Sequence, residues 1–162
     1  MDFQDHYRRK LRTADQAAAL IARDADVAMG MAVAEPPALL AALARRAGAG
    51  GLDRLRLWYF HSLDHAGATV LRPELLGTVR PHRMFLSRVE RRLMADPALG
   101  EAAIEFVPVA FSESPRLLTQ DVELDACITT VSPMDRHGFF TFGTSNDYTS
   151  AAARAARRLI VE

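Results

Sequence analysis

The chain has 162 residues, which is enough for one domain with a substantial apolar core, since domains of about 100–200 residues are the norm. Its 49% hydrophobic and 25% charged residues are typical of a globular protein and exclude a fibrous or disordered chain. Twenty basic residues balance twenty acidic ones, so the composition offers no general attraction for nucleic acid or for an anionic membrane surface.

The single cysteine and the amino-terminal segment indicate the compartment. Cys127 cannot form an internal disulfide, and it lies in an apolar run where a buried, unreactive thiol is expected. The segment MDFQDHYRRKLRTADQ lacks the apolar stretch of a signal peptide, and no run is apolar enough to span a membrane. We therefore expect a soluble, cytoplasmic domain without membrane or nucleic-acid partners.

The first predicted elements are a helix and a strand. Thr13 and Gln16 have the spacing of a capping box, and the apolar residues that follow fall on one helical stripe. These patterns predict an amphipathic helix over residues 13–23, broken at residues 24–26. The short apolar run 27–31 predicts a buried strand.

A second helix and strand follow. Glu35-Pro36-Pro37 predicts a helix start, because proline is tolerated in the first turn. The helix is expected to end at the glycine-rich residues 48–51, which no Lys-Ser/Thr pair follows and which therefore predict a linker instead of a phosphate loop. Residues 55–60 predict the second strand, parallel to the first.

The middle of the chain, residues 62–100, shows no dominant period. Beyond it, residues 104–109 predict a third strand. Ser114-Pro115 predicts the start of a short helix, with serine as its cap and proline at its first position.

The last quarter of the chain again alternates strands and helices. The apolar run 126–131 predicts a fourth, buried strand. Residues 132–138 predict a turn, followed by a short extended piece at 139–142. A helix is expected over residues 150–158 and a further strand over 159–161.

This alternation predicts an α/β fold with an open, mostly parallel sheet flanked by helices. In such sheets, ligands bind beyond the carboxyl ends of the strands, where the strand order switches. Two stretches rich in glycine, proline and short polar residues follow predicted strands, namely residues 30–37 and 132–143.

Metal binding is not predicted. His61 and His65 have the spacing of one helix face, with Asp64 between them, but the preceding strand is expected to run into this segment. No third ligand is evident.

The segment Ser132-Pro-Met-Asp-Arg-His-Gly138 allows two interpretations. Ser132, Asp135 and His137 are the residue types of a hydrolase triad, but known triads draw their members from separate parts of the chain. We favour a rigid turn in which Ser132 and Asp135 bind backbone amides and Gly138 allows a positive φ. Hydrolysis by Ser132 and His137 stays the alternative.

Glu35 is a candidate carboxylate nucleophile by residue type. Its position at a predicted helix start suggests that the helix dipole stabilises its charge and lowers its pKa. We therefore expect a binding residue and not a nucleophile.

Three segments together resemble the amino-terminal half of the acetyl-CoA hydrolase/transferase family, which includes 4-hydroxybutyrate and succinyl/acetate CoA-transferases. They are ADQAAALIARDADVAMGMAVAEPPALLAALARRA, IEFVPVAFSESPRLL and DACITTVSPMDRHGFFTFGTSNDYTSAAARAARRLIVE. The most specific piece is VSPMDRHGF with Phe142-Gly143 beyond it. The resemblance covers nearly the whole chain but only about the first two-fifths of a typical family member.

The resemblance implies a class I CoA-transferase-like amino-terminal domain that faces a second, similar domain across the active site. The reaction it implies moves CoA between short-chain carboxylic acids through a glutamyl-CoA intermediate, with coenzyme A or acyl-CoA as substrate and no permanently bound cofactor. The nucleophilic glutamate belongs to the family's second half. No catalytic residue is therefore expected in residues 1–162, which should be inactive without the carboxyl-terminal half or a subunit carrying it.

The residues carried over as walls of the cleft come from the two strand-exit loops. They are Gly30, Met31, Glu35 and Pro36 in the first loop, and Ser132, His137, Gly138, Phe140 and Gly143 in the second. The alternative interpretation is a non-catalytic ligand-binding or interaction module derived from this fold, which pairs with itself as a homo-oligomer or with another partner.

Overall fold

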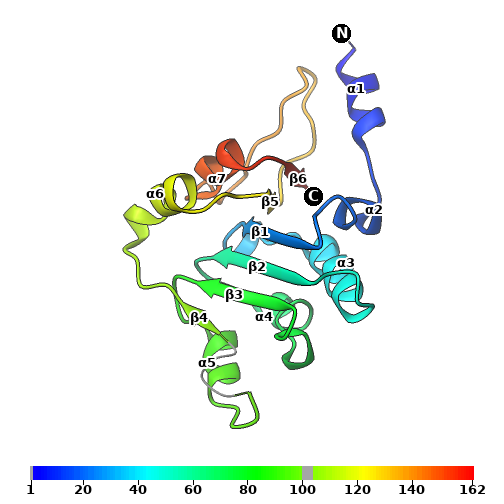
Figure 1. Cartoon of the computed structure of the whole chain (residues 1–162). Coiled ribbons are helices and arrows are strands. Elements are labelled where there is room, and N and C mark those ends of the chain that lie inside the picture. Colours follow the sequence, from blue (N-terminus) through cyan, green and yellow to red (C-terminus); the bar gives the residue numbers. More distant parts are fainter. Residues whose placement is uncertain (1, 100–103) are drawn as a thin grey trace.

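Six parallel strands form the sheet of the computed structural model, which describes residues 2–99 and 104–162 (Figure 1). The strand order is β4-β3-β2-β1-β5-β6, and every neighbouring pair is parallel. The order changes direction between β1 and β5, which places a topological switch point at the centre of the sheet. The strands are β1 (Asp24–Met29), β2 (Arg54–Tyr59), β3 (Val79–Arg83), β4 (Glu105–Phe106), β5 (Ala126–Thr129) and β6 (Leu159–Val161).

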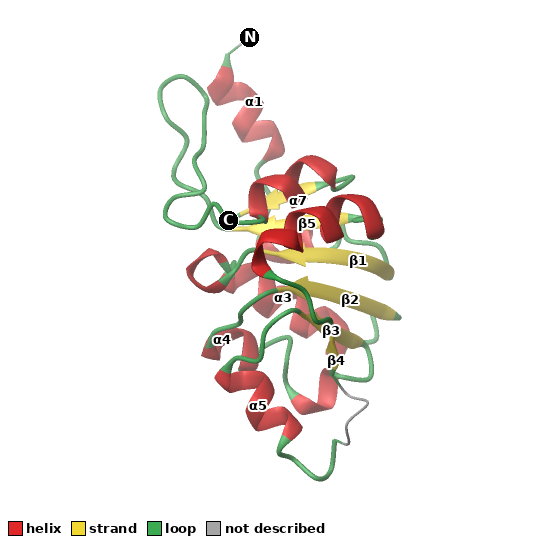
Figure 2. Ribbon diagram, turned by 90° about the vertical axis from the view of Figure 1, so that its left-hand side faces the viewer, coloured by secondary structure: helices red, strands yellow, loops and turns green. Residues whose placement is uncertain are grey.

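Helices cover both faces of this sheet (Figure 2). They are α1 (Phe3–Lys10), α2 (Ala14–Ala18), α3 (Pro37–Gly48), α4 (Asp64–Gly67), α5 (Arg88–Met94), α6 (Ser114–Arg116) and α7 (Thr149–Ala155). Short 3₁₀ turns occur at Ala32–Ala34, Pro73–Leu75 and Phe111–Glu113, and a π-helical turn follows α6 at Leu117–Asp121. This three-layer arrangement confirms the predicted α/β class and its open parallel sheet.

Two apolar clusters, one on each face, hold the layers together. The larger joins α2, α3, α4 and α5 to one face of the sheet and includes the fully buried Leu40 and Leu57. The smaller joins the π-helical turn and α7 to the other face, over Ala28 and Cys127. Cys127 is buried, as predicted, and burial raises the pKa of its thiol to about 12, which favours the protonated thiol.

Several predicted elements are confirmed. The capping box of Thr13 and Gln16 starts α2, with hydrogen bonds of 3.0 and 3.2 Å. Helix α3 begins at Pro37 and ends at Gly48, just before Gly50, whose φ is 71°. The predicted strand over residues 159–161 is β6.

The boundary between the first helix and strand was predicted wrongly. Helix α2 ends at Ala18, and β1 already begins at Asp24. The reason is cross-strand pairing, because Arg56 lies 2.7 Å from Asp24 and 2.6 Å from Asp26 across the β1–β2 pair. Residues that read as helix breakers therefore form the start of the strand.

The middle of the chain holds a strand that the sequence did not reveal. Strand β3 contains Pro81 and three basic residues, and its pairing with β2 overrides this poor strand propensity. The strand predicted over residues 104–109 is reduced to two residues, Glu105 and Phe106. Ser114 is not a cap, because the turn Phe111–Glu113 runs directly into α6 and the Ser114 N–H bonds to the Phe111 carbonyl.

The amino terminus of α3 receives a carboxylate from the far end of the chain. Glu162, directly after β6, accepts hydrogen bonds from the backbone N–H of Ala38 at 3.1 Å and of Leu39 at 2.9 Å. These two amides belong to the first turn of α3, where backbone donors lack helical partners and the helix dipole favours a negative charge. Glu162 thereby ties β6 to the helix that follows β1.

We predict that Glu162→Ala lowers the free energy of unfolding by about 0.5–2 kcal/mol, the usual cost of removing a helix cap. Urea denaturation of the two proteins measures the difference. Glu123→Ala is the matched control, because the Glu123 side chain is 89% exposed and a surface ion pair contributes little. Equal losses in both variants would contradict the capping role.

Within the described residues, no helix combines the length and apolar character needed to cross a membrane.

Candidate functional site

The loop that leaves β1 packs closely against the end of β5. A Cβ atom at Gly30 would lie 2.5 Å from Thr129 Oγ1 and 2.6 Å from the Ala34 carbonyl oxygen, so only glycine fits here. The Gly30 N–H bonds to the Ile128 carbonyl at 2.9 Å, and Ala32 adopts a positive φ of 52°. The first exit loop is thus folded tightly over the switch point of the sheet.

The first exit loop is joined to the loop that leaves β2. The Ala32 N–H donates to the His61 carbonyl at 3.2 Å. From the other face of the sheet, the Tyr148 hydroxyl donates to the Met29 carbonyl at 2.6 Å and accepts from the Phe60 N–H at 3.2 Å. One buried hydroxyl therefore satisfies the backbone ends of both central strands.

Glu35 lies inside this junction, which corrects the prediction of a charge held at a helix start. Its side chain is fully buried; Oε1 accepts the Leu63 N–H at 2.9 Å, and Oε2 lies 2.8 Å from His65 Nε2 without hydrogen-bond alignment. Burial raises the Glu35 pKa to about 8; the Leu63 bond opposes this rise and the charge of Glu90 adds to it. The amides of α3 are capped by Glu162 instead.

A second buried glutamate, Glu90, binds residues at the end of β2. Glu90 Oε1 accepts hydrogen bonds from the Tyr59 hydroxyl at 2.8 Å and from Ser62 Oγ at 2.5 Å. Its Oε2 accepts the Ser87 N–H at 2.9 Å in a capping box that starts α5. Burial raises the pKa of Tyr59, so its hydroxyl stays a donor. This network ties the exits of β2 and β3 together.

An apolar surface lies where β1, β2 and β3 end. The Phe60 ring stacks on Phe85 with centroids 5.8 Å apart and meets Phe111 edge-on at 4.7 Å. Phe85 and Phe111 are each 47% exposed, and the His61 ring lies 5.7 Å from Phe85. Partly buried Met31 packs on the same cluster as Phe60. This Met31–Phe60–Phe85–Phe111 surface can receive an apolar group.

The sequence did not identify most of this surface. Phe85 follows a strand that was not predicted, and Phe111 belongs to a 3₁₀ turn that was not predicted either. Tyr148 also gave no local signal, because its partners are 119 and 88 residues away in the chain.

The second exit loop is the rigid turn that we favoured. Asp135 accepts the N–H of His137 at 2.8 Å and of Phe139 at 2.9 Å, and the Phe139 bond contributes most to the lowering of its pKa. Ser132 Oγ donates to the Pro133 carbonyl and accepts the Thr141 N–H. His137 Nε2 accepts from Arg136. The Ser132 and His137 side chains thus bond to other groups and form no catalytic pair.

The end of β5, which leads into the second exit loop, contacts the first exit loop. Thr130 N–H donates to the Ala34 carbonyl at 2.9 Å, which joins the end of β5 to the first loop. Farther along, the second loop extends beside α1 (Figures 1 and 2), where Phe140 lies 6.0 Å from Tyr7. The first-loop residues Gly30, Met31, Glu35 and Pro36 thus gather at the switch point, while His137, Gly138 and Phe140 lie at α1.

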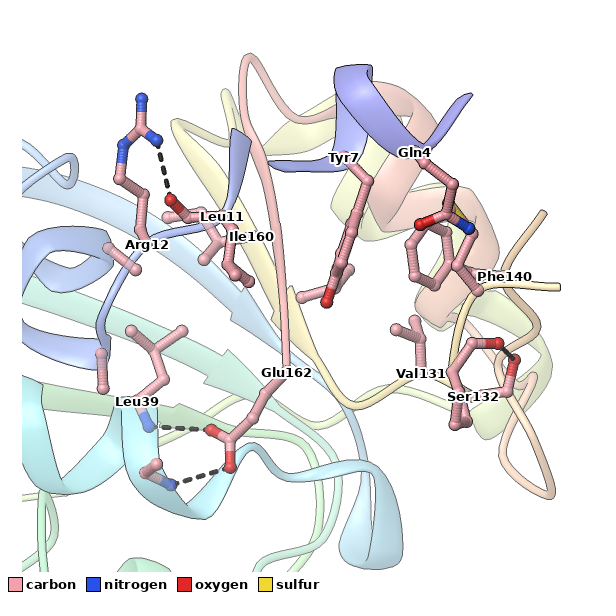
Figure 3. A pocket seen from close by; sticks show the side chains of 16 residues that line it. Gln4, Tyr7, Leu11, Arg12, Leu39, Val131, Ser132, Phe140, Ile160 and Glu162 are labelled. Atoms are coloured by element: carbon pink, nitrogen blue, oxygen red, sulfur yellow. Dashed lines mark hydrogen bonds between the residues drawn. The ribbon is translucent and has the colours of Figure 1, made fainter. Parts of the chain in front are cut away.

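A groove is lined by α1, β6 and the second loop (Figure 3). It has a volume of about 670 Å³, and its lining includes Tyr7, Ser132, Phe140 and Glu162. Two of the predicted site residues, Ser132 and Phe140, therefore face this groove and not the Met31–Phe60–Phe85–Phe111 surface. Among residues 2–99 and 104–162, no three His, Cys, Asp or Glu side chains lie close enough to hold a metal ion.

Together these features define an α/β domain with a candidate ligand surface at the carboxyl ends of the parallel strands β1, β2 and β3. The comparison with known sequences then identifies it: the chain belongs to the family of the acetyl-CoA hydrolase/transferase N-terminal domain, which it matches over residues 1–162.

Solved structures and curated relatives agree with this assignment. The chain resembles RipA from Yersinia pestis with a TM-score of 0.94 and 44% identity, covering 99% of this chain and 38% of RipA. It resembles the 4-hydroxybutyrate CoA-transferase of Porphyromonas gingivalis with a TM-score of 0.75 and 25% identity, covering 98% and 34%. It is 29% identical to the succinyl-CoA:cyclohexane-1-carboxylate CoA transferase of Geobacter metallireducens, over 99% of this chain and 34% of that protein. The chain thus spans about a third of the length of these relatives.

We predict that Glu35 makes the stability of the domain fall as the pH rises. Its pKa is about 8 in the folded protein and 4.5 ordinarily, so between these values the folded state holds a proton that the unfolded state has lost. Across this window, the Glu35 contribution should decline by about 1.4 kcal/mol per pH unit. It is complete below about pH 4.5 and absent above about pH 8.

Urea denaturation from pH 5 to pH 8.5 of the natural chain and of Glu35→Gln measures this effect, because glutamine imitates the neutral acid at every pH. The natural chain should lose stability relative to the variant as the pH rises. The exposed Glu113→Gln serves as control and should show a constant difference. A constant difference for Glu35→Gln as well would refute the neutral, buried state.

We also predict that Tyr148→Phe lowers the free energy of unfolding by about 1–3 kcal/mol, since it leaves the Met29 carbonyl and the Phe60 N–H buried without their partner. Hydrogen exchange at the Phe60 amide should accelerate in the same variant. Tyr7→Phe, which alters a partly exposed ring, is the control and should change little. Unchanged Phe60 exchange in Tyr148→Phe would argue against the bridging role.

Proposed function

We propose that this chain forms one wall of the active site of a CoA-transferase, which moves CoA between short-chain carboxylic acids. The observation that carries the proposal is the Met31–Phe60–Phe85–Phe111 surface at the ends of β1, β2 and β3, in a chain that belongs to this family. An apolar surface with few polar groups suits the hydrocarbon part of an acyl group. We propose that the second exit loop, with Ser132, His137, Gly138, Phe140 and Gly143, contacts the remaining part of the enzyme, because Ser132 and Phe140 face the groove beside α1.

The proposed chemistry is covalent catalysis by a glutamate outside residues 1–162. The glutamate carboxylate attacks the thioester carbonyl of an acyl-CoA, which forms a mixed anhydride and releases CoA thiolate. The thiolate then attacks the glutamyl carbonyl of the anhydride, which forms a glutamyl-CoA thioester and frees the first acid. A second acid enters by the reverse steps and leaves as its CoA thioester, so that one difficult transfer is divided into easier ones.

The described residues support the proposal that this part of the active site carries no catalytic group of its own. Glu35, the carboxylate nearest to the switch point, is buried beneath the loop, and its raised pKa makes it a poor nucleophile at neutral pH. The amides of Gly30 and Ala32 already donate to the Ile128 and His61 carbonyls. Neither is free to stabilise an oxyanion, so we assign both the nucleophile and the oxyanion donors to the remaining part of the enzyme.

The experiment compares this chain alone with the chain co-expressed with the part of RipA that lies beyond the matched 38%. The chain alone should exchange no CoA between acetyl-CoA and labelled acetate, whereas the pair should do so. Borohydride reduction followed by mass spectrometry should locate the CoA thioester on a glutamate of the RipA part. Phe60→Ala should raise the KM for the acyl-CoA more than it lowers kcat.

Turnover by the 162 residues alone would refute this assignment, and its loss in Ser132→Ala would favour hydrolysis by Ser132 and His137. A pair that assembles but transfers nothing would favour the non-catalytic binding module.

A further inference from the structure

Arg83, the last residue of β3, is a buried cation that lacks an anionic partner. It is 1% exposed and lies beside Tyr59 on the face of the sheet that α5 covers. In the described part of the chain, Nε and Nη1 have no hydrogen-bond partner and no carboxylate forms a salt bridge with the guanidinium. Buried charges are normally paired, because burial removes the hydration that stabilises them in water. The unused donors of Arg83 therefore suit an anion.

Glu90 does not act as this anion. Burial lowers the pKa of Arg83, whereas Tyr59 and Glu90 oppose this shift, so the glutamate is close enough to influence the guanidinium. Both oxygens of Glu90, however, already accept the hydrogen bonds that hold the end of β2. The ordinary pKa of arginine is so high that the guanidinium keeps its charge at neutral pH. Its donors remain unsatisfied.

Two side chains with exposed surface cover the guanidinium. Arg83 Nη2 donates to Met94 Sδ at 3.1 Å, and the centre of the Phe106 ring lies 5.7 Å from Arg83 Cζ. Met94 is 51% exposed and Phe106 49%. A thioether sulfur is a weak acceptor on a flexible side chain, so an oxygen anion can replace it at Nη2. Rotation of the Met94 side chain thus opens the guanidinium to a small ligand.

The chemistry of these three side chains selects the ligand. Once Met94 is displaced, Nη2 and a neighbouring nitrogen of Arg83 form the fork that matches the two oxygens of a carboxylate. The Phe106 ring and the Met94 stem offer apolar surface directly beside this charge. A carboxylate with a short hydrocarbon chain satisfies both features, whereas an inorganic anion satisfies only the first.

We propose that Arg83, Met94 and Phe106 form a binding site for a free short-chain carboxylate. The choice of a short-chain acid rests on the proposed function, in which such acids are a substrate and a product. The site differs from the acyl surface described above, because Phe60 packs with the apolar cluster on the opposite face of the sheet. The acid therefore has a second binding site in addition to the surface proposed for the acyl group.

The test titrates the chain, labelled with [methyl-¹³C]methionine, with sodium butyrate at constant ionic strength. The Met94 methyl resonance, assigned by its loss in Met94→Leu, should shift to saturation as the sulfur leaves Nη2. The Met134 resonance, from the second exit loop, should not shift. Butyramide has the same shape without the charge and should bind about tenfold more weakly or less, since charge-assisted hydrogen bonds are the stronger ones.

Variants of Arg83 locate the acid. Arg83→Met should weaken butyrate binding about tenfold or more, and Arg83→Lys, which keeps the charge without the fork, should bind with intermediate affinity. Urea denaturation verifies that both variants are folded. Arg92→Met removes an exposed arginine of the same helix as Met94 and should bind butyrate normally. Phe60→Ala should also bind normally, because it alters only the acyl surface.

Equal affinity for butyrate and butyramide, or equal affinity in the natural chain, Arg83→Met and Arg83→Lys, would overturn the proposal. Loss of binding in Phe60→Ala would do the same, because the acid would then bind the acyl surface. Inorganic phosphate that competes with butyrate at equal affinity would refute the choice of ligand. These measurements need no transfer of CoA. A pair with the RipA part that transfers no CoA would refute the proposed function alone, whereas active transfer without butyrate binding at Arg83 would refute only this site.

Discussion

Strands β1, β2 and β5 end side by side at the centre of this sheet. The buried backbone N–H and C=O groups at these ends need hydrogen-bond partners within the protein. The structure meets this requirement by close packing of Gly30 on Thr129, by the Tyr148 hydroxyl between Met29 and Phe60, and by Glu35 at the Leu63 amide. Each contact joins segments that are far apart in the chain. The aromatic surface above them is held in place because the loops beneath cannot shift independently.

The two buried glutamates fulfil this requirement in different ways. Glu90 accepts hydrogen bonds from Tyr59, Ser62 and Ser87, so its negative charge is well compensated. Burial favours the neutral form of Glu35; its one hydrogen bond, from the Leu63 N–H, opposes this, and the charge of Glu90 adds to it. A neutral acid beneath the first loop can hold the Leu63 amide without placing a second buried charge in the core.

Local patterns were sufficient to predict elements whose signals lie within a few residues. The Thr13–Gln16 capping box, the proline start of α3 and the Asp135 turn are examples, and the family resemblance identified both exit loops. Long-range effects were not predictable: Asp24 and Asp26 are strand residues because Arg56 pairs with them, and β3 is a strand because β2 lies beside it. The Glu35 pKa was predicted in the wrong direction because its burial depends on the β2 exit loop.

The two exit loops are positioned by different contacts. The first loop is fixed at the switch point by buried hydrogen bonds to the ends of β2 and β5. The second loop contacts α1 through Phe140, and a Cβ atom at Gly138 would meet the Phe3 ring at 2.6 Å. Its residues thus help to line the groove beside α1, while Glu162 in the same groove caps α3, the helix that follows the first loop. Glu162 therefore connects this groove directly to the helix behind the first loop.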